Sequence, residues 1–182
     1  MPCAIIDRCL TSFLMKPFGF AGWSGSGKTT LIEQLIPRFV AAGVRVSVVK
    51  HAHHDFDTDQ PGKDSWRHRR AGATEVLVTA ARRWVLMHEL REAREPTLAE
   101  HMTRLAPCDL LLVEGFKHEP IPKLEIHRRA LGKPVLWDHD GDIVAVATDE
   151  PLETPLPQLP LDDVSAIAAF VLNHVGLTNP PS

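Results

Sequence analysis

The sequence predicts an α/β fold in which a mostly parallel sheet is flanked by helices and carries an inserted β-hairpin as a small β subdomain. Apolar runs of strand length alternate with amphipathic stretches along most of the chain, which is typical of parallel sheets. The run Asp109–Val113 is apolar after its first residue, as in a strand buried on both faces. A glycine-rich loop at residues 22–29 joins the first apolar run to an amphipathic stretch.

Five apolar runs of strand length make up the predicted main sheet: Phe18–Ala21, Val44–Lys50, Asp109–Val113, Lys123–His127 and Ile143–Ala147. Four stretches with helical spacing lie between and after them: Lys28–Ala42, Asp64–Ala71, Thr97–Ala106 and Leu161–Val175. Two further strand-like runs, Thr74–Thr79 and Arg83–Leu90, are separated by a short linker and predict the hairpin.

The first helix shows the clearest periodicity. Leu31, Leu35 and Phe39 fall on one stripe, and Ile32, Ile36 and Val40 lie beside it. Pro37 should kink this helix, and Gly43 supplies its stop. In the last helix the inward positions are Val164, Ile167, Ala168 and Val171. Asp64 is a candidate N-cap, and Pro151–Pro160 is expected to be a stiff surface connector.

We expect one domain over residues 15–176, with the hairpin insert at about 74–90, an N-terminal extension at 1–14 outside the fold, and a tail at 177–182.

Composition limits the partners. The chain of 182 residues has 20 Lys+Arg against 23 Asp+Glu, a net charge of −3, which argues against a nucleic-acid partner. No apolar stretch approaches the length of about 20 residues that spans a bilayer, so we expect no membrane span. The three cysteines, Cys3, Cys9 and Cys108, fit a reducing cytoplasm better than a disulfide framework, and Cys108 is expected to be buried.

Residues 22–29, GWSGSGKT, match the phosphate-binding pattern G-x-x-x-x-G-K-[ST] between a strand and a helix, which predicts the fold of a P-loop NTPase. Backbone N–H groups of such a loop and the helix N-terminus bind phosphate oxygens. Lys28 can bridge the terminal phosphates and assist catalysis, and Thr29 can offer its hydroxyl to Mg²⁺. The predicted nucleotide-binding residues of the loop are Gly22, Ser24, Gly25, Ser26, Gly27, Lys28, Thr29 and Thr30.

A P-loop also needs a carboxylate near its metal. Asp109 and Glu114 flank one predicted strand and lie about 16 Å apart along it, so only one of them can reach the site. Ligands gather at the carboxyl ends of parallel strands, which selects Glu114. Gly115 would then allow a close backbone approach.

The segment from Lys50 to Asp59 leaves the same edge of the sheet and contains His51, His53 and His54. It could contact the γ-phosphate or the Mg²⁺ water shell, form a solvated loop, or bind a transition metal. The basic group that follows, Lys63, Arg67, Arg69 and Arg70, could meet phosphates or form a solvated helix face. Asp149, after a late strand, is the nearest substitute for a guanine-reading carboxylate, although a turn carboxylate is the default interpretation of an acid at this position.

Together the motifs resemble the MobB family of molybdopterin-guanine dinucleotide biosynthesis adapter proteins. The resemblance is carried by FGFAGWSGSGKTTLIEQL, VVKHAHHDFDTDQPGKDSWRHRRAGA, RRWVLMHEL, DLLLVEGFKHEPIPKLEIHR and IVAVATDEPL. It implies a GTP-binding homodimer with weak GTPase activity that assists the guanylyltransferase MobA, which attaches GMP to molybdopterin. It also implies that Gly25, Gly27, Lys28 and Thr29 bind phosphate and Mg²⁺, that Glu114 is the Walker B acid, and that Asp59, Lys63 and Asp64 line the nucleotide cleft.

Two other functions share the P-loop. A small-molecule kinase would use the Arg67, Arg69 and Arg70 cluster in a lid, and a metal-delivery GTPase would use the three histidines. No residue stands out as an arginine finger or a water-orienting group, so hydrolysis should be slow. The free edge of the hairpin predicts that it contributes to a dimer interface.

Overall fold

The computed structural model describes residues 15–52 and 56–178, so the predicted extension at 1–14, Cys3, Cys9, His53, His54 and the end of the tail lie outside the described residues. The chain forms two compact units. Unit 1 comprises the described residues up to His51 and from His101 onward, and unit 2 comprises Ala52–Glu100.

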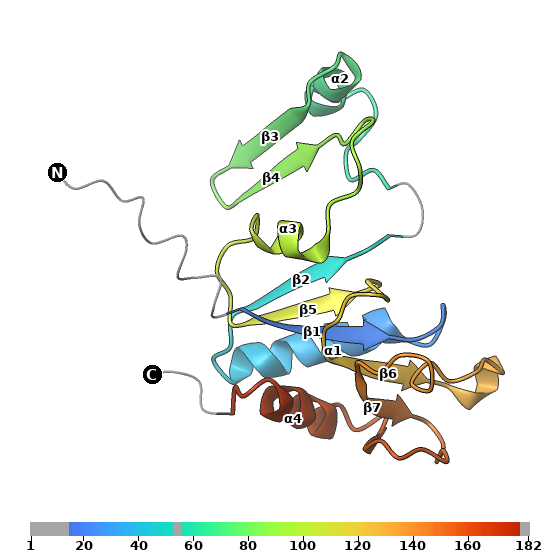
Figure 1. Cartoon of the computed structure of the whole chain (residues 1–182). Coiled ribbons are helices and arrows are strands. Elements are labelled where there is room, and N and C mark those ends of the chain that lie inside the picture. Colours follow the sequence, from blue (N-terminus) through green and yellow to red (C-terminus); the bar gives the residue numbers. More distant parts are fainter. Residues whose placement is uncertain (1–14, 53–55, 179–182) are drawn as a thin grey trace. The chain divides into compact units, whose positions relative to one another are not determined.

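Unit 1 is built on a parallel sheet with the strand order β2-β5-β1-β6-β7-β8 (Figure 1). Its strands are β1 (Lys16–Ala21), β2 (Val46–Lys50), β5 (Leu110–Glu114), β6 (Lys123–His127), β7 (Ile143–Thr148) and β8 (Gln158–Pro160). The predicted α/β class with a parallel sheet is therefore confirmed. The sixth strand was not predicted, because β8 lies in the Pro-rich segment that we expected to be only a connector. It pairs with the outer side of β7, where an edge strand tolerates prolines.

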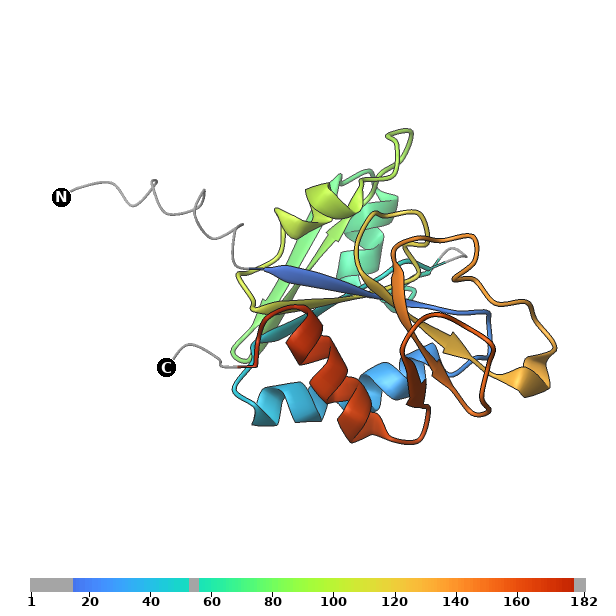
Figure 2. The same cartoon turned by 60° about the horizontal axis from the view of Figure 1, so that its bottom comes forward.

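Helices α1 (Lys28–Ala41) and α4 (Val164–His174) pack beside each other on one face of the sheet (Figure 2). The core between them and the sheet includes Phe18, Leu35, Leu112 and Ile167, all fully buried. The predicted inward positions of both helices are buried, except that Ile36 is only partly buried and Val40 is 57% exposed. Helix α1 runs through Pro37, and Gly43 follows it with a positive φ of 80°, as expected of a stop.

Strand β5 is buried along its whole length, as its continuous apolar sequence predicted. Cys108, just before it, is a buried free thiol, also as predicted.

Strand β6 carries charged side chains into the interior. The Lys123 ammonium lies 3.1 Å from a carboxylate oxygen of Asp140 and 3.4 Å from one of Asp142. The carboxylate of Glu125 accepts the backbone N–H groups of Leu136 (2.9 Å) and Trp137 (3.0 Å). Burial raises the pKa of Glu125, and the two N–H bonds oppose that rise. Both side chains therefore anchor the long loop that follows the short 3-10 helix η2 (Arg129–Leu131).

Unit 2 contains α2 (Asp64–Arg70) and an antiparallel hairpin of β3 (Glu75–Ala80) and β4 (Arg83–His88), so the predicted hairpin is confirmed. Asp64 is not the N-cap of α2: that position is Lys63, and no side chain caps the helix. Helix α3 (Leu98–Met102) is shorter than predicted. It begins at a capping box, in which the Thr97 N–H donates to Glu100 (2.8 Å) and the Glu100 N–H donates to the Thr97 hydroxyl (3.3 Å).

In the part of the chain that the structure describes, no helix combines the length and the apolar character needed to cross a bilayer.

Gly19 tests the packing of β6 against β1. A Cβ at this position would lie 2.7 Å from Cγ of Lys123, near the rigid end of a buried side chain. We predict that Gly19→Ala lowers the free energy of unfolding by about 1–3 kcal/mol, the usual effect of overpacking a filled core. Urea denaturation measures the change.

Gly141→Ala is the matched control, because a Cβ there would meet no atom within 4 Å and its φ is not in the left-handed region. Its unfolding free energy should stay within about 1 kcal/mol of the native value. Equal effects at the two positions would contradict the assigned packing.

Candidate functional site

The P-loop joins the end of β1 to the start of α1 at the carboxyl edge of the sheet. Gly27 is the N-cap of α1 and has a left-handed φ of 95°, which favours glycine, and it offers no side chain to cover the first-turn N–H groups. The N-terminus of α1 is therefore open to an anion. Ser24, Gly25 and Thr30 lie on the exposed side of the loop, whereas Gly22 and Ser26 are buried. The Ser26 hydroxyl has no hydrogen-bond partner among the described residues.

Lys28 folds back over this loop. Its ammonium donates to the carbonyl oxygens of Gly22 (2.8 Å) and Trp23 (2.9 Å), so the charge is held at the loop rather than in open solvent. Burial lowers the pKa of Lys28, and the Glu114 carboxylate opposes this shift. The positive charges of Lys117 and Lys50 lower it further. A polyanion would relieve this local excess of positive charge.

Thr29 and Glu114 meet directly, as the choice of Glu114 over Asp109 required. The Thr29 hydroxyl donates to Oε1 of Glu114 at 2.8 Å. A hydroxyl and a carboxylate beside a phosphate site are the oxygen ligands that Mg²⁺ takes, so the residues present fit this ion. Asp109 lies at the opposite end of β5, where it binds the backbone N–H (2.8 Å) and the guanidinium of Arg45.

Lys50, the first residue of the segment that the sequence placed at this edge of the sheet, is a member of this site to which no individual role was assigned. Its ammonium lies 3.4 Å from Oε2 of Glu114 and donates to the Thr29 hydroxyl at 3.3 Å. The register of β2 on β5, which places Lys50 opposite Glu114, produces the contact. The position of Lys50 at the carboxyl end of a predicted strand indicated that it lies near the site. Its contact with Glu114 could be assigned only once the pairing of β2 with β5 was known.

Gly115 directly follows β5 and lies close to the backbone of His51, which directly follows β2. A Cβ at Gly115 would lie 2.8 Å from the carbonyl oxygen of His51, and its φ of 98° is left-handed. The predicted close approach at Gly115 is therefore confirmed. The His51 N–H donates to the Glu114 carbonyl (2.8 Å), and its ring lies 5.2 Å from that of Phe116.

On the other side of the P-loop strand, Arg128 follows β6 and reaches the loop. Its Nε donates to the Ser26 carbonyl at 3.0 Å, and its Nη1 lies 3.8 Å from Oδ2 of Asp149. Asp149 also accepts the Arg129 N–H at 3.1 Å. The structure thus links Asp149 to the P-loop through Arg128, a residue that the sequence did not single out.

Trp23, inside the P-loop pattern, makes cation–π contacts with two lysines. Its Nε1 donates to the Pro134 carbonyl at 2.8 Å, and the ammonium groups of Lys117 and Lys133 lie 5.9 Å and 5.7 Å from its ring centroid. These exposed cations add to the positive field at the loop.

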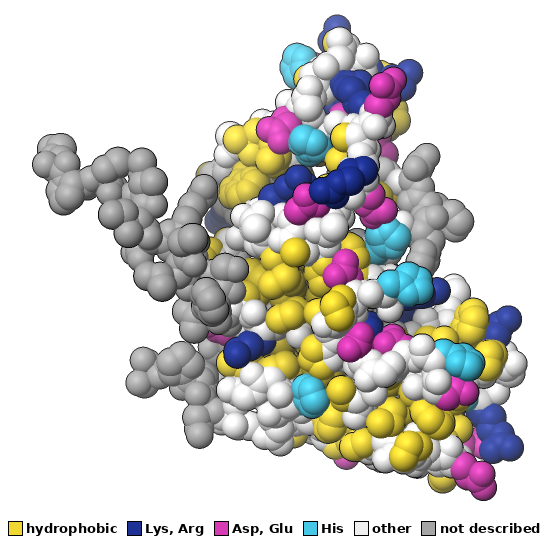
Figure 3. Space-filling view, in the orientation of Figure 1, with side chains coloured by type: hydrophobic (Ala, Val, Ile, Leu, Met, Phe, Trp, Pro, Cys, Tyr) yellow, Lys and Arg dark blue, Asp and Glu magenta, His cyan; other side chains and the backbone are white. Residues whose placement is uncertain are grey.

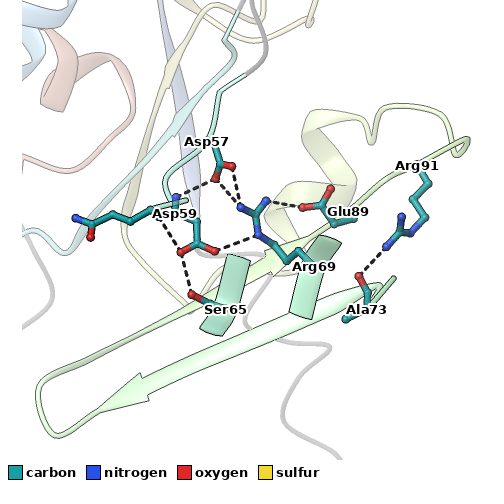
Figure 4. Close-up of polar contacts among 8 residues, drawn as sticks. Asp57, Asp59, Ser65, Arg69, Ala73, Glu89 and Arg91 are labelled. Carbon is teal, nitrogen blue, oxygen red and sulfur yellow. Dashed lines mark hydrogen bonds and ion pairs between the residues drawn. The ribbon is translucent and has the colours of Figure 1, made fainter. Parts of the chain in front are cut away.

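In unit 2, Arg69 organises the acidic segment (Figure 4). Its guanidinium binds Asp57 (2.8 Å), Asp59 (3.3 Å) and Glu89 (2.7 Å), and the Ser65 hydroxyl donates to Asp59 (2.8 Å). The Arg69 hydrogen bonds hold the pKa of Asp57 below its ordinary value. The Asp59 side chain is only 8% exposed. Asp59, which the resemblance implied for the nucleotide cleft, therefore anchors its own segment in unit 2.

The basic group is not one continuous cationic face. Arg69 is committed to three carboxylates, Arg67 lies 3.8 Å from Asp64, and Arg70 lies over the ring of Trp66. Lys63 and Asp64, both implied for the cleft, are exposed residues of unit 2 at the start of α2.

The histidine segment is described only in part, because His53 and His54 lie outside the described residues. Among the residues that are described, no group of three or more His, Cys, Asp or Glu side chains is placed to hold a metal ion.

Comparisons with family models, known proteins and solved structures each return one family in common. The family model described as molybdopterin guanine dinucleotide synthesis protein B, MobB, matches residues 18–149. The chain is 44% identical over 163 residues to the molybdopterin-guanine dinucleotide biosynthesis adapter protein of Escherichia coli (strain K12), covering 88% of this chain and 93% of that protein. It is 46% identical over 156 residues to the protein of that name from Haemophilus influenzae, covering 85% and 86%.

A crystal structure of molybdopterin-guanine biosynthesis protein B superposes with a TM-score of 0.70 at 28% identity, covering 87% of this chain and 99% of that one. The sequence matches extend over most of both chains, and the same family recurs in each comparison. The chain therefore belongs to the MobB family.

Proposed function

We propose that this protein is a GTP-binding adapter in molybdenum cofactor biosynthesis that assists the conversion of molybdopterin to molybdopterin guanine dinucleotide. The observation that carries the proposal is the contact of Thr29 with Glu114 beside Lys28 at the open N-terminus of α1. Family membership supplies the pathway. The guanylyltransferase MobA is the proposed partner, molybdopterin a further ligand and the cytoplasm the proposed location.

The nucleotide site supports binding and slow hydrolysis. Lys28 would leave the carbonyl groups of Gly22 and Trp23 and bind the terminal phosphates. Thr29 and Glu114 would hold Mg²⁺, which supplies neutralising charge for the phosphates. The chain's own contribution is a set of fixed donors in a short loop. The sequence assigned no arginine finger or water-orienting group, so we expect slow turnover.

Lys28→Ala tests the function. Loss of one charge-assisted contact should weaken GTP binding in Mg²⁺ by roughly ten- to hundredfold, as measured by calorimetry. Lys16→Ala, a change of an exposed lysine at the opposite end of β1, should leave binding unchanged. An unaltered GTP affinity in Lys28→Ala would refute the proposed site.

The same pair of variants tests the partner. Immobilised MobA should retain the native protein and Lys16→Ala in GTP and Mg²⁺, and should retain Lys28→Ala less. If MobA retained the native protein equally with and without GTP, the binding of the two proteins would not depend on the nucleotide, which would contradict a GTP-dependent adapter.

The position of Asp149 supports a base-reading role. The metal-side residue Glu114 is on β5, on one side of β1, and β6 and β7 lie on the other side. A nucleotide whose terminal phosphates face β5 therefore directs its base toward the loops after β6 and β7. The Asp149 carboxylate, 31% exposed, can accept hydrogen bonds from guanine N1 and N2 there.

Asp149→Asn should weaken GTP binding and strengthen XTP binding, each by roughly tenfold. The reason is that an asparagine amide can donate to the carbonyl that replaces the amino group of guanine. Competition titrations measure the ratio of the two affinities. Glu150→Gln, the same chemical change at the next residue, should leave the ratio of the GTP and XTP affinities unchanged. If Asp149→Asn also had the ratio of the native protein, Asp149 would not contact the base.

The hairpin of unit 2 supports a homodimer. Hydrophobic side chains gather on its surface (Figure 3), with Leu77 59% and Trp84 66% exposed. Leu77 pairs with Leu86 across the strands, and Trp84 lies on the same face, while Val78 and Val85 are exposed on the other. A two-stranded ribbon that is apolar on both faces is marginal alone, so a second copy is the proposed cover.

Light scattering at micromolar concentration should give twice the mass of the chain for the native protein and a single mass for Leu86→Lys. Val40→Lys, which adds the same charge at an exposed apolar residue of α1, should remain dimeric. A monomeric native protein would exclude the dimer.

A further inference from the structure

The parallel pairing of β2 with β5 places Lys50 directly opposite Glu114. Both residues end their strands at the edge where the P-loop leaves β1. The Lys50 ammonium is therefore brought to the residues that would hold a metal, although Lys50 lies far from the P-loop in the sequence.

In the structure, that ammonium contacts both members of the metal pair. It lies 3.4 Å from Oε2 of Glu114 and 3.3 Å from the hydroxyl oxygen of Thr29. The same hydroxyl donates its proton to Oε1 of Glu114 at 2.8 Å. Because a hydroxyl has one proton and two lone pairs, Lys50 uses acceptor capacity that a metal ion would need.

We propose that Lys50 competes with the metal for this site: its ammonium takes the place of the divalent cation between Thr29 and Glu114, and metal binding requires it to leave. The proposal rests on the proposed nucleotide function. The Glu114 side chain is only 9% exposed, so a cation beside it keeps its charge compensated while no metal is bound.

The exchange needs movement of one side chain and not of the strand. The backbone after Lys50 is fixed by the bond from the His51 N–H to the Glu114 carbonyl (2.8 Å). The Lys50 side chain itself is 54% exposed, so it can swing into solvent or toward bound phosphates without breaking the sheet. The site thus holds either the ammonium or the metal at nearly constant backbone geometry.

The test is a titration of the full chain with Mn²⁺, the probe for Mg²⁺, in saturating GDP, with free Mn²⁺ followed by electron paramagnetic resonance. Lys50→Met removes the competing charge, and the Kd for Mn²⁺ should fall by roughly tenfold. Lys50→Gln, a second neutral variant, should show the same direction. Lys50→Arg, which keeps a cation, should stay closer to the native value than either neutral variant.

Two controls fix the location. Lys16→Met removes an equal charge at the other end of β1 and should leave the Kd unchanged. Glu114→Gln should weaken Mn²⁺ binding in both the native and the Lys50→Met background. If Lys16→Met tightened binding as much as Lys50→Met, the effect would be one of net charge, and the proposal would fail.

GDP binding in Mg²⁺, measured by calorimetry on the native chain, separates the two ideas. No GDP binding would overturn the proposed function. GDP binding with an unchanged or weaker affinity of Lys50→Met for Mn²⁺ would overturn the role of Lys50 and leave the nucleotide function standing.

Discussion

Parallel pairing in register between β1 and β5 is the constraint on which the site depends. It sets Phe20 opposite Glu114, so the strand that leads into the P-loop and the strand that carries the acid end at the same level. The pairing of β2 on the far side of β5 adds Lys50 at that level. Since side chains alternate across a strand, a shift of one residue in β5 would turn Glu114 to the other face of the sheet and break its contact with Thr29.

Much of this arrangement could be predicted from local spacing. The glycines, Lys28 and Thr29 identify the loop because they lie between an apolar run and an amphipathic helix, and strand length separates Glu114 from Asp109. What could not be predicted depends on strand order and side-chain pairing. Lys50 meets Glu114 only because β5 lies between β2 and β1. Likewise, the basic pattern around Arg69 does not reveal that its charge is turned inward to Asp57, Asp59 and Glu89.

Two buried charged side chains of β6 hold the loop that follows this strand. Lys123 binds Asp140 and Asp142, and Glu125 binds the N–H groups of Leu136 and Trp137, so β6 fixes the segment that follows it. The partners compensate these two buried groups for the loss of water. Removing one partner would leave a buried charge without compensation, which would destabilise the fold. Sequence patterns that count apolar residues favour β6 as a strand but give no sign of this anchoring.

Gly115 has a consequence for how substitutions in this protein are interpreted. It has no side chain with which to touch a ligand, yet any larger residue would collide with the carbonyl of His51, next to Lys50. A saturation screen for nucleotide binding would therefore rank Gly115 with Lys28 and Glu114. A substitution at Gly115 would act by displacing the neighbouring backbone at His51. A loss of nucleotide binding in such a variant would therefore not show that Gly115 touches the ligand.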